Sequence, residues 1–136
     1  MMRARATQRS NCTHDVSVRK HRMTADEPED HGGEDMGPSP QELLAASLAS
    51  CTAITMEMYA RRKGWNVDGM AVEVDCDNTP AERGRPTMIG HVLKLPESLS
   101  EEQVERLLVI AAKCPIHRTL EGEVVFDERV QRVAPV

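Results

Sequence analysis

Two cysteines far apart in the chain have residue types suited to redox chemistry. Cys114 follows Cys51 by 63 positions, so the fold must bring the two thiols together if they are to react with each other. A thiolate can attack a peroxide O–O bond and become a sulfenic acid, and a second thiol can then attack that sulfur and close a disulfide. The spacing alone does not establish such a meeting, and two separate core cysteines remain the alternative.

The predicted settings of the two thiols differ. Cys51 falls in the middle of an apolar helix, where burial raises a thiol pKa unless a positive charge or a hydrogen-bond donor reaches it. Cys114 precedes Pro115, which disfavours helical geometry at Cys114 and suits the first position of a new helix. A helix N-terminus lowers the pKa of a thiol, so the predicted settings shift the pKa values of Cys51 and Cys114 in opposite directions.

The remaining cysteines and a nearby histidine have simpler interpretations. Cys12 falls at a predicted turn and reads as an incidental exposed thiol, whereas Cys76 lies on the apolar face of an alternating segment. His91 shares a face with apolar neighbours and is expected to be a packed or edge histidine. The Cys114-x-x-His117 pair is only half of a zinc site, and no Cys-x-x-Cys occurs, so neither a metal nor another cofactor is predicted.

One long helix is expected to position Cys51. Ser39 and Glu42 have the spacing of a capping box, and Pro40 occupies a position where a missing N–H costs nothing. Basic residues precede Gly64, which can adopt the left-handed conformation that ends a helix. These signals predict a helix over Pro40–Lys63, roughly 36 Å long at 1.5 Å per residue.

This helix has no broad polar side, which is typical of a buried helix. A membrane span is the alternative, but Glu42 and Glu57 interrupt the apolar run and both ends are capped, so no membrane association is expected. A chain of 136 residues offers little material to cover such a helix. We therefore expect a second copy of the chain to cover it in a homodimer.

The other predicted elements complete a single α+β domain over residues 1–136. Alternating patterns and turn residues predict antiparallel strands on both sides of the long helix, and capping signals predict two further helices. The first part of the chain is predicted to contain N-terminal strands within 3–26 and an acidic loop over 26–35. A second strand-helix half is predicted over 70–130, and it begins with strands at 70–77 and 87–95 around a polar loop at 78–86. It continues with an amphipathic helix from Ser100 to Cys114, a short helix over 115–120 and a last strand over 123–127.

Composition narrows the partners and the compartment. The net charge is −5 and no basic stripe is present, so nucleic acid is not an expected partner. The basic N-terminus lacks the apolar segment of a secretory signal, and four cysteines are few for a disulfide scaffold. We therefore expect a cytoplasmic protein.

Two ordered motifs resemble those of a known family. The segment Gly32–Thr52 resembles the central-helix motif of the OsmC/Ohr family of osmotically induced and organic-hydroperoxide-resistance proteins, and Lys113–Leu120 resembles its second cysteine motif. Ala25–Pro28 and Tyr59–Trp65 are similar to the OsmC-like, YhfA-type subgroup. The resemblance covers about residues 13–130.

The resemblance implies a fold and a role for each cysteine. It implies antiparallel sheets wrapped around a long buried helix, in an intertwined homodimer with each active site near the subunit interface. It also implies that Cys51 is the peroxidatic thiol and that Cys114 resolves it as a Cys51–Cys114 disulfide.

The resemblance further implies supporting residues, and here the chain departs from the family pattern. The family's best peroxidases have a Glu ten residues before the first cysteine; that position is Gln41 here, with Glu42 one step along. One step turns a helical side chain by about 100°, and Glu42 also has a structural role as the capping-box partner of Ser39.

Two other supporting residues remain open. The family Arg from the N-terminal strands corresponds to either Arg19 or Arg22. His117, about one helical turn past Cys114, either tunes that thiol or is simply a packed or exposed histidine.

Together these features predict a thiol-dependent peroxidase that reduces organic hydroperoxides, with hydrogen peroxide as a further candidate, in oxidative or osmotic stress. The family implies an external dithiol or a lipoylated protein as reductant. The alternative is a redox sensor or an apolar-ligand-binding protein on the same fold, without turnover, which the Gln41 departure favours.

Overall fold

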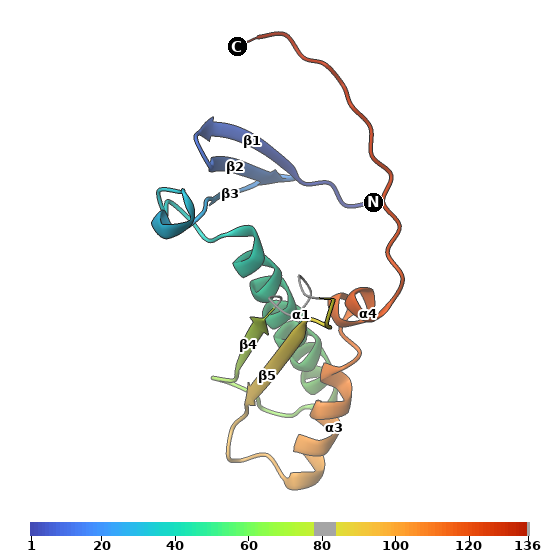
Figure 1. Cartoon of the computed structure of the whole chain (residues 1–136). Coiled ribbons are helices and arrows are strands. Elements are labelled where there is room, and N and C mark those ends of the chain that lie inside the picture. The colour runs from blue at the N-terminus through green and yellow to red at the C-terminus, as the bar shows by residue number, and fades with distance from the viewer. Residues whose placement is uncertain (78–83, 136) are drawn as a thin grey trace.

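The computed structural model describes residues 1–77 and 84–135. It has two antiparallel sheets and one long central helix, in the α+β arrangement that the sequence predicts (Figure 1). Residues 78–83 of the predicted polar loop lie outside the described residues.

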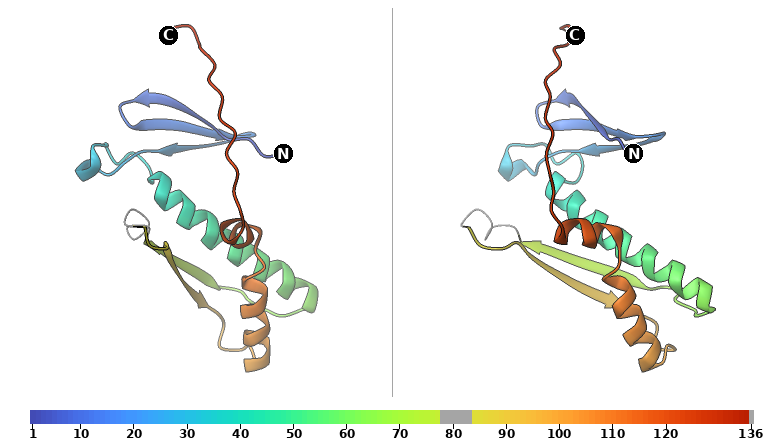
Figure 2. Two further views of the ribbon diagram at one scale, coloured as in Figure 1. Left: turned by 45° about the vertical axis from the view of Figure 1, so that its right-hand side comes forward. Right: turned by 90° about the vertical axis from the view of Figure 1, so that its right-hand side faces the viewer.

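The N-terminal sheet consists of β1 (Arg5–Ser10), β2 (Thr13–Val18) and β3 (His21–Ala25), in that spatial order. Asn11 and Arg19 occupy the two turns with φ of 52° and 53°, the left-handed region that tight turns require. The predicted antiparallel strands within 3–26 are confirmed, and of the two or three strands that the sequence left open the structure has three. The sheet lies beyond the N-terminal end of the central helix, away from the second sheet (Figures 1 and 2).

A buried carboxylate organises the acidic loop that follows. Asp26 is 2% exposed and accepts hydrogen bonds from the Thr13 hydroxyl at 2.6 Å and from the backbone N–H of Glu27 at 2.7 Å. The loop includes a short 3-10 helix, η1 (Glu29–His31). A Cβ added at Gly37 would lie 2.2 Å from a backbone oxygen of β3, so the chain can pass this point only with glycine.

The central helix α1 spans Pro40–Lys63, as predicted. The capping box is complete: the N–H of Glu42 donates to Ser39 Oγ at 3.2 Å, and the N–H of Ser39 donates to Glu42 Oε1 at 2.9 Å. Gly64 ends the helix with a φ of 73°.

One chain buries only part of α1. Only one stripe of residues at i, i+4, i+8 and i+12 is buried, namely Leu48, Thr52, Met56 and Ala60. Ile54 and Met58, on other faces, are 55% and 60% exposed. Within one chain α1 is therefore buried along this stripe, where β4, α3 and α4 contact it, and the covering of its other faces by a second copy stays a prediction. By length and hydropathy alone α1 would suffice to cross a membrane, with 22% of its most apolar window buried.

The second half of the chain packs on that stripe. Strands β4 (Ala71–Asp77) and β5 (Met88–Lys94) form an antiparallel hairpin, followed by helices α3 (Glu101–Ala111) and α4 (Pro115–Glu121). These match the predicted elements closely. The hydrophobic core lies where α1, the loop that follows it and α3 pack together. It contains Met56, Ala60, Val67, Leu107 and Ala111.

The predicted last strand is absent from the described chain. Residues 122–135 run as an extended segment away from α4 (Figures 1 and 2). Val125 and Phe126 are 85% and 81% exposed. The prediction over 123–127 is wrong here because a strand needs a neighbouring edge to satisfy its N–H and C=O groups, and within the described residues this segment pairs with none.

Candidate functional site

The structure brings Cys51 and Cys114 into contact. Cys51 lies near the middle of α1, three residues after the buried Leu48, and Cys114 lies at the junction of α3 and α4. The junction forms because the turn after α3 is closed by a hydrogen bond from the N–H of Lys113 to the carbonyl of Ile110 at 2.9 Å. The Cys51 thiol donates a hydrogen bond to the sulfur of Cys114.

The Cys114 thiol is fully buried, but protein groups donate hydrogen bonds to its sulfur. It is the N-cap of α4, and its sulfur accepts the backbone N–H of His117 at 3.3 Å. Thr52 Oγ1 lies 3.9 Å from the same sulfur, but its single proton is better placed to donate to the Leu48 carbonyl at 2.8 Å. The strongest support for a thiolate on Cys114 therefore comes from Cys51 and His117.

The two thiols have opposite pKa shifts. Burial raises the pKa of Cys51, and donation of its hydrogen bond to Cys114 raises it further, against smaller opposing contributions from the N–H of Ile116 and the hydroxyl of Thr55. Burial also raises the pKa of Cys114, but the hydrogen bonds that its sulfur accepts outweigh this effect and leave the pKa below its ordinary value. The first proton that the pair loses therefore comes mainly from Cys114, and the remaining proton is shared between the two sulfurs.

The predicted carboxylate does not lie at the dithiol. Glu42 is engaged in the capping box with Ser39 at the first turn of α1. Together with Gln41 it lines a separate hollow that also includes Cys76 of β4. The capping interpretation of Glu42 accounts for its position.

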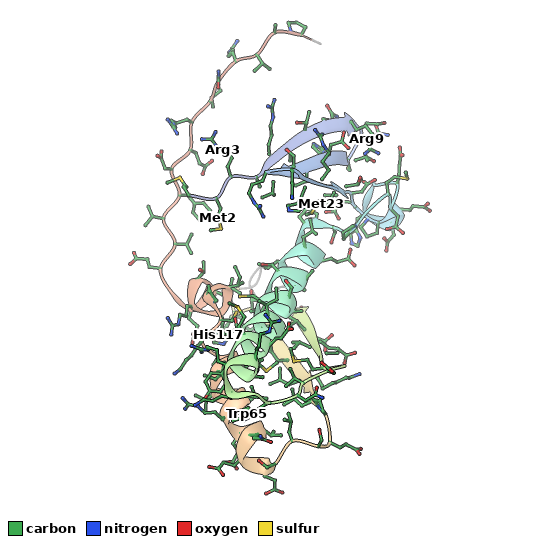
Figure 3. All side chains as sticks on the ribbon, turned by 180° about the vertical axis from the view of Figure 1, so that it is seen from behind. Met2, Arg3, Arg9, Met23, Trp65 and His117 are labelled. Atoms are coloured by element: carbon green, nitrogen blue, oxygen red, sulfur yellow. The ribbon has the colours of Figure 1, made fainter. Side chains whose placement is uncertain are left out.

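The predicted arginines lie on the N-terminal sheet. Arg19 occupies the turn between β2 and β3, and Arg22 in β3 pairs with Ser17. Figure 3 shows Met23 of the same strand beside the N-terminal end of α1, away from His117. Within one chain, neither arginine is brought to the dithiol.

His117 has two roles in the structure. Its backbone N–H supports Cys114, and its ring Nδ1 lies 2.8 Å from Glu121 Oε1, close enough for an ion pair when protonated but without hydrogen-bond geometry. The ring centroids of His117 and His91 are 6.2 Å apart. Burial lowers the pKa of His91, and the proximity of His117 lowers it further.

Both histidines line a cavity of about 210 Å³ next to the dithiol, together with Thr52 and apolar residues of β5 and α3. Sequence reasoning missed this juxtaposition. Strand alternation placed His91 on the face of Leu93, but only the packing of β5 beside α4 reveals its neighbour.

The described residues contain no group of three or more His, Cys, Asp or Glu side chains that could hold a metal ion. Cys114 and His117 remain half of a site, and the ring of His117 faces Glu121. The interaction between the Cys51 and Cys114 thiols supports redox chemistry at this site.

The fold and the paired thiols define an α+β dithiol protein. A family model described as OsmC-like protein matches residues 32–129. The chain belongs to the OsmC-like family, as its two motifs indicated.

Solved structures agree on the fold. The chain is similar to a candidate osmotic-stress-induced and detoxification response protein from Psychrobacter arcticus, with 22% identity, a TM-score of 0.74 and 88% of each chain covered. It is also similar to an OsmC-like protein from Mycoplasma pneumoniae, with 20% identity, a TM-score of 0.75, and 90% of this chain and 88% of that chain covered.

A third similar structure is the organic hydroperoxide resistance protein OhrB of Bacillus subtilis, with 20% identity, a TM-score of 0.58, and 90% of this chain and 91% of that chain covered. A search of curated proteins found no match.

Proposed function

We propose that this chain is a thiol peroxidase of the OsmC/Ohr type that reduces organic hydroperoxides in oxidative or osmotic stress. The observation that supports the proposal is the interaction between the Cys51 and Cys114 thiols, because two thiols in contact can form a disulfide. Cys51 is the more accessible thiol, since Cys114 is fully buried.

The reaction follows from this contact. Cys51 sulfur attacks the terminal peroxide oxygen, the O–O bond breaks, and Cys51 becomes a sulfenic acid. The Cys114 thiolate accepts the Cys51 proton and passes it to the leaving alkoxide, which departs as an alcohol. Cys114 then attacks the sulfenic sulfur, hydroxide leaves and takes a proton to form water, and a Cys51–Cys114 disulfide remains. An external dithiol or a lipoylated protein reduces the disulfide in the cytoplasm.

The proposal includes a homodimer. The outer face of α1 exposes Ile54 and Met58, and the extended C-terminal segment exposes Phe126. A second copy would bury these side chains, and would supply the N-terminal sheet of one chain to the dithiol of the other. Arg19 or Arg22 would then reach Cys51 across the interface and lower its pKa.

A second candidate function is redox sensing or apolar-ligand binding without turnover. Gln41 in place of the family Glu, together with the raised pKa of Cys51, favours this alternative. It predicts stoichiometric oxidation that does not recycle.

Peptide mapping by mass spectrometry tests the proposal. One equivalent of an organic hydroperoxide without reductant should produce a Cys51–Cys114 disulfide, and a dithiol should restore multiple turnovers. Cys51→Ser should abolish turnover, Cys114→Ser should leave a trapped Cys51 sulfenic acid, and Cys76→Ser is the matched control that should behave as wild type. Two unmodified thiols would refute the peroxidase, and a disulfide without recycling would favour the second candidate.

A further inference from the structure

The cavity of about 210 Å³ beside the dithiol has a polar side that the proposed reaction does not use. His91 of β5, His117 of α4 and Thr52 of α1 form this polar side. The two imidazole rings lie 6.2 Å apart, centroid to centroid. The other described residues that line the cavity are apolar, namely Leu93, Leu108, Ala111 and Ala112.

Thr52 and His117 both connect this cavity to Cys114. Thr52 Oγ1 lies 3.9 Å from the Cys114 sulfur, and the backbone N–H of His117 donates to the same sulfur at 3.3 Å. His117 follows Cys114 by three positions, and side chains at this spacing on a helix are neighbours. The His117 imidazole is therefore a neighbour of the thiol that loses its proton first.

The surroundings of the His117 ring suit its protonated form. Its Nδ1 is buried and has no hydrogen-bond partner among the described residues, while Glu121 Oε1 lies 2.8 Å from it. A neutral ring gains little from this arrangement, whereas an imidazolium forms an ion pair with the carboxylate. The Glu121 side chain is 67% exposed, so this ion pair alone is weak. A second negative charge is needed to hold the proton, and the Cys114 thiolate supplies it.

The charged groups around the ring favour one proton on the two histidines rather than two. On β5, burial lowers the pKa of His91, and the proximity of His117 lowers it further. On α4 the ring faces Glu121, α1 contributes the Cys51 thiol that contacts Cys114, and the cavity-lining residues of α3 are apolar. Two imidazolium ions at this separation would repel each other, so the single proton lies on His117.

We propose that His117 is the proton-exchange group of the dithiol: its imidazolium pairs with the Cys114 thiolate in the reduced chain and gives up its proton when the disulfide forms. The pairing does not depend on turnover, whereas the transfer step rests on the proposed function. The two parts are therefore tested separately.

The transfer step closes with all protons and electrons assigned. When Cys114 attacks the Cys51 sulfenic sulfur, an S–S bond forms, the S–O bond breaks, and the leaving hydroxide takes the His117 proton and departs as water. The thiolate and the imidazolium thus lose their charges together.

Reduction of the disulfide returns the proton. Neutral His117 takes it from the external dithiol, whose sulfur attacks Cys51 while Cys114 leaves as a thiolate. The second thiol of the reductant then displaces the first sulfur from Cys51 and passes its proton to Cys51. The reductant leaves as a disulfide, and the ion pair of the reduced chain is restored.

Histidine-ring NMR titrations of the full chain test the pairing. The dithiol chain is compared with the Cys51–Cys114 disulfide chain formed by diamide, which needs no peroxidase activity. The His117 ring should keep its proton to a pH about one unit higher in the dithiol chain, because a nearby opposite charge favours the charged form. His31, whose side chain is 70% exposed in the acidic loop, is the internal control and should titrate identically in both chains. Equal His117 midpoints in the two chains would overturn the inference.

Two variants separate the thiolate from other influences on the ring. Reduced Cys114→Ser should give His117 the midpoint of the disulfide chain, because serine carries no negative charge; a midpoint equal to that of the wild-type dithiol would refute the pairing. His91→Gln is the matched control in the same cavity, and it should raise the His117 midpoint equally in both oxidation states. If diamide forms no disulfide, the proposed function fails, and Cys114→Ser still decides the pairing.

Rapid mixing with an organic hydroperoxide tests the transfer step. His117→Gln retains the backbone N–H that supports Cys114 but lacks the ring proton. Closure of the disulfide from the Cys51 sulfenic acid should slow about 100-fold, and imidazole in the buffer should restore part of the rate, which a purely structural role would not allow. Closure at the wild-type rate in His117→Gln would refute the transfer step and leave the peroxidase proposal intact.

Discussion

Replacement of Cys51 by alanine should raise the pKa of Cys114. The Cys51 thiol donates to the Cys114 sulfur and is the leading influence that lowers its pKa, while burial acts in the opposite direction and remains in the variant. A hydrogen bond to a charged group is worth about 1.5–3 kcal/mol, and 1.36 kcal/mol corresponds to one pKa unit. Because a thiol is a weak donor, we expect the low end of this range, a rise of about one unit.

The assay is a pH titration of the ¹³Cβ chemical shift in cysteine-labelled protein, which reports on Cys114 although alkylating reagents do not reach it. Thr52→Val should raise the pKa of Cys114 far less, because the Thr52 hydroxyl donates mainly to Leu48. Cys76→Ala is the control and should leave it unchanged. An unchanged Cys114 pKa in the Cys51→Ala variant would refute the shared proton, and with it the proton transfer in the proposed reaction.

Three further predictions concern stability and assembly. Leu107→Ala should destabilise the fold by about 2–5 kcal/mol, read from urea midpoints, because Leu107 is fully buried between α1 and α3. The hydrogen bond from the Thr13 hydroxyl is the largest influence that lowers the pKa of Asp26. The ionised Asp26 therefore stabilises the fold above the unfolded-state pKa near 3.8, and this stabilisation is lost as pH falls through the lower folded-state pKa. Melting temperatures of Asp26→Asn should therefore fall below wild type at pH 7, with the difference shrinking in acid; a constant difference would contradict this. Truncation after Glu121 should shift a dimer toward monomer in analytical ultracentrifugation, and an unchanged mass would show that the C-terminal segment is not part of the interface.

Local signals in the sequence were sufficient for most of the fold. Ser39, Pro40 and Gly64 define the ends of α1 because caps depend on residues within one turn. The N-terminal strands follow from alternation and from turn residues near Asn11 and Lys20, although the sequence left two or three strands open. Such features require no knowledge of distant contacts.

The failures share a physical cause. Val125 and Phe126 have strand propensity, but a strand also needs a pairing partner, and within the described residues this segment pairs with none. The burial of α1 depends likewise on what surrounds it. The contact between Cys51 and Cys114 was left open for the same reason, since 63 positions of chain separate them.

The buried Asp26 also fixes the orientation of the N-terminal sheet relative to α1. Its carboxylate binds Thr13 of β2, its own N–H donates to the Pro38 carbonyl at 3.2 Å, and Gly37 passes against Thr24 at a spacing that excludes any side chain. The joint between the N-terminal sheet and α1 is therefore stiff, although the sheet packs little on the rest of its own chain. The sheet projects from the helix as a fixed arm, and the angle of that arm is set by one carboxylate and one glycine. Substitutions at these two positions would alter how the arm approaches another molecule while leaving every group at the dithiol in place.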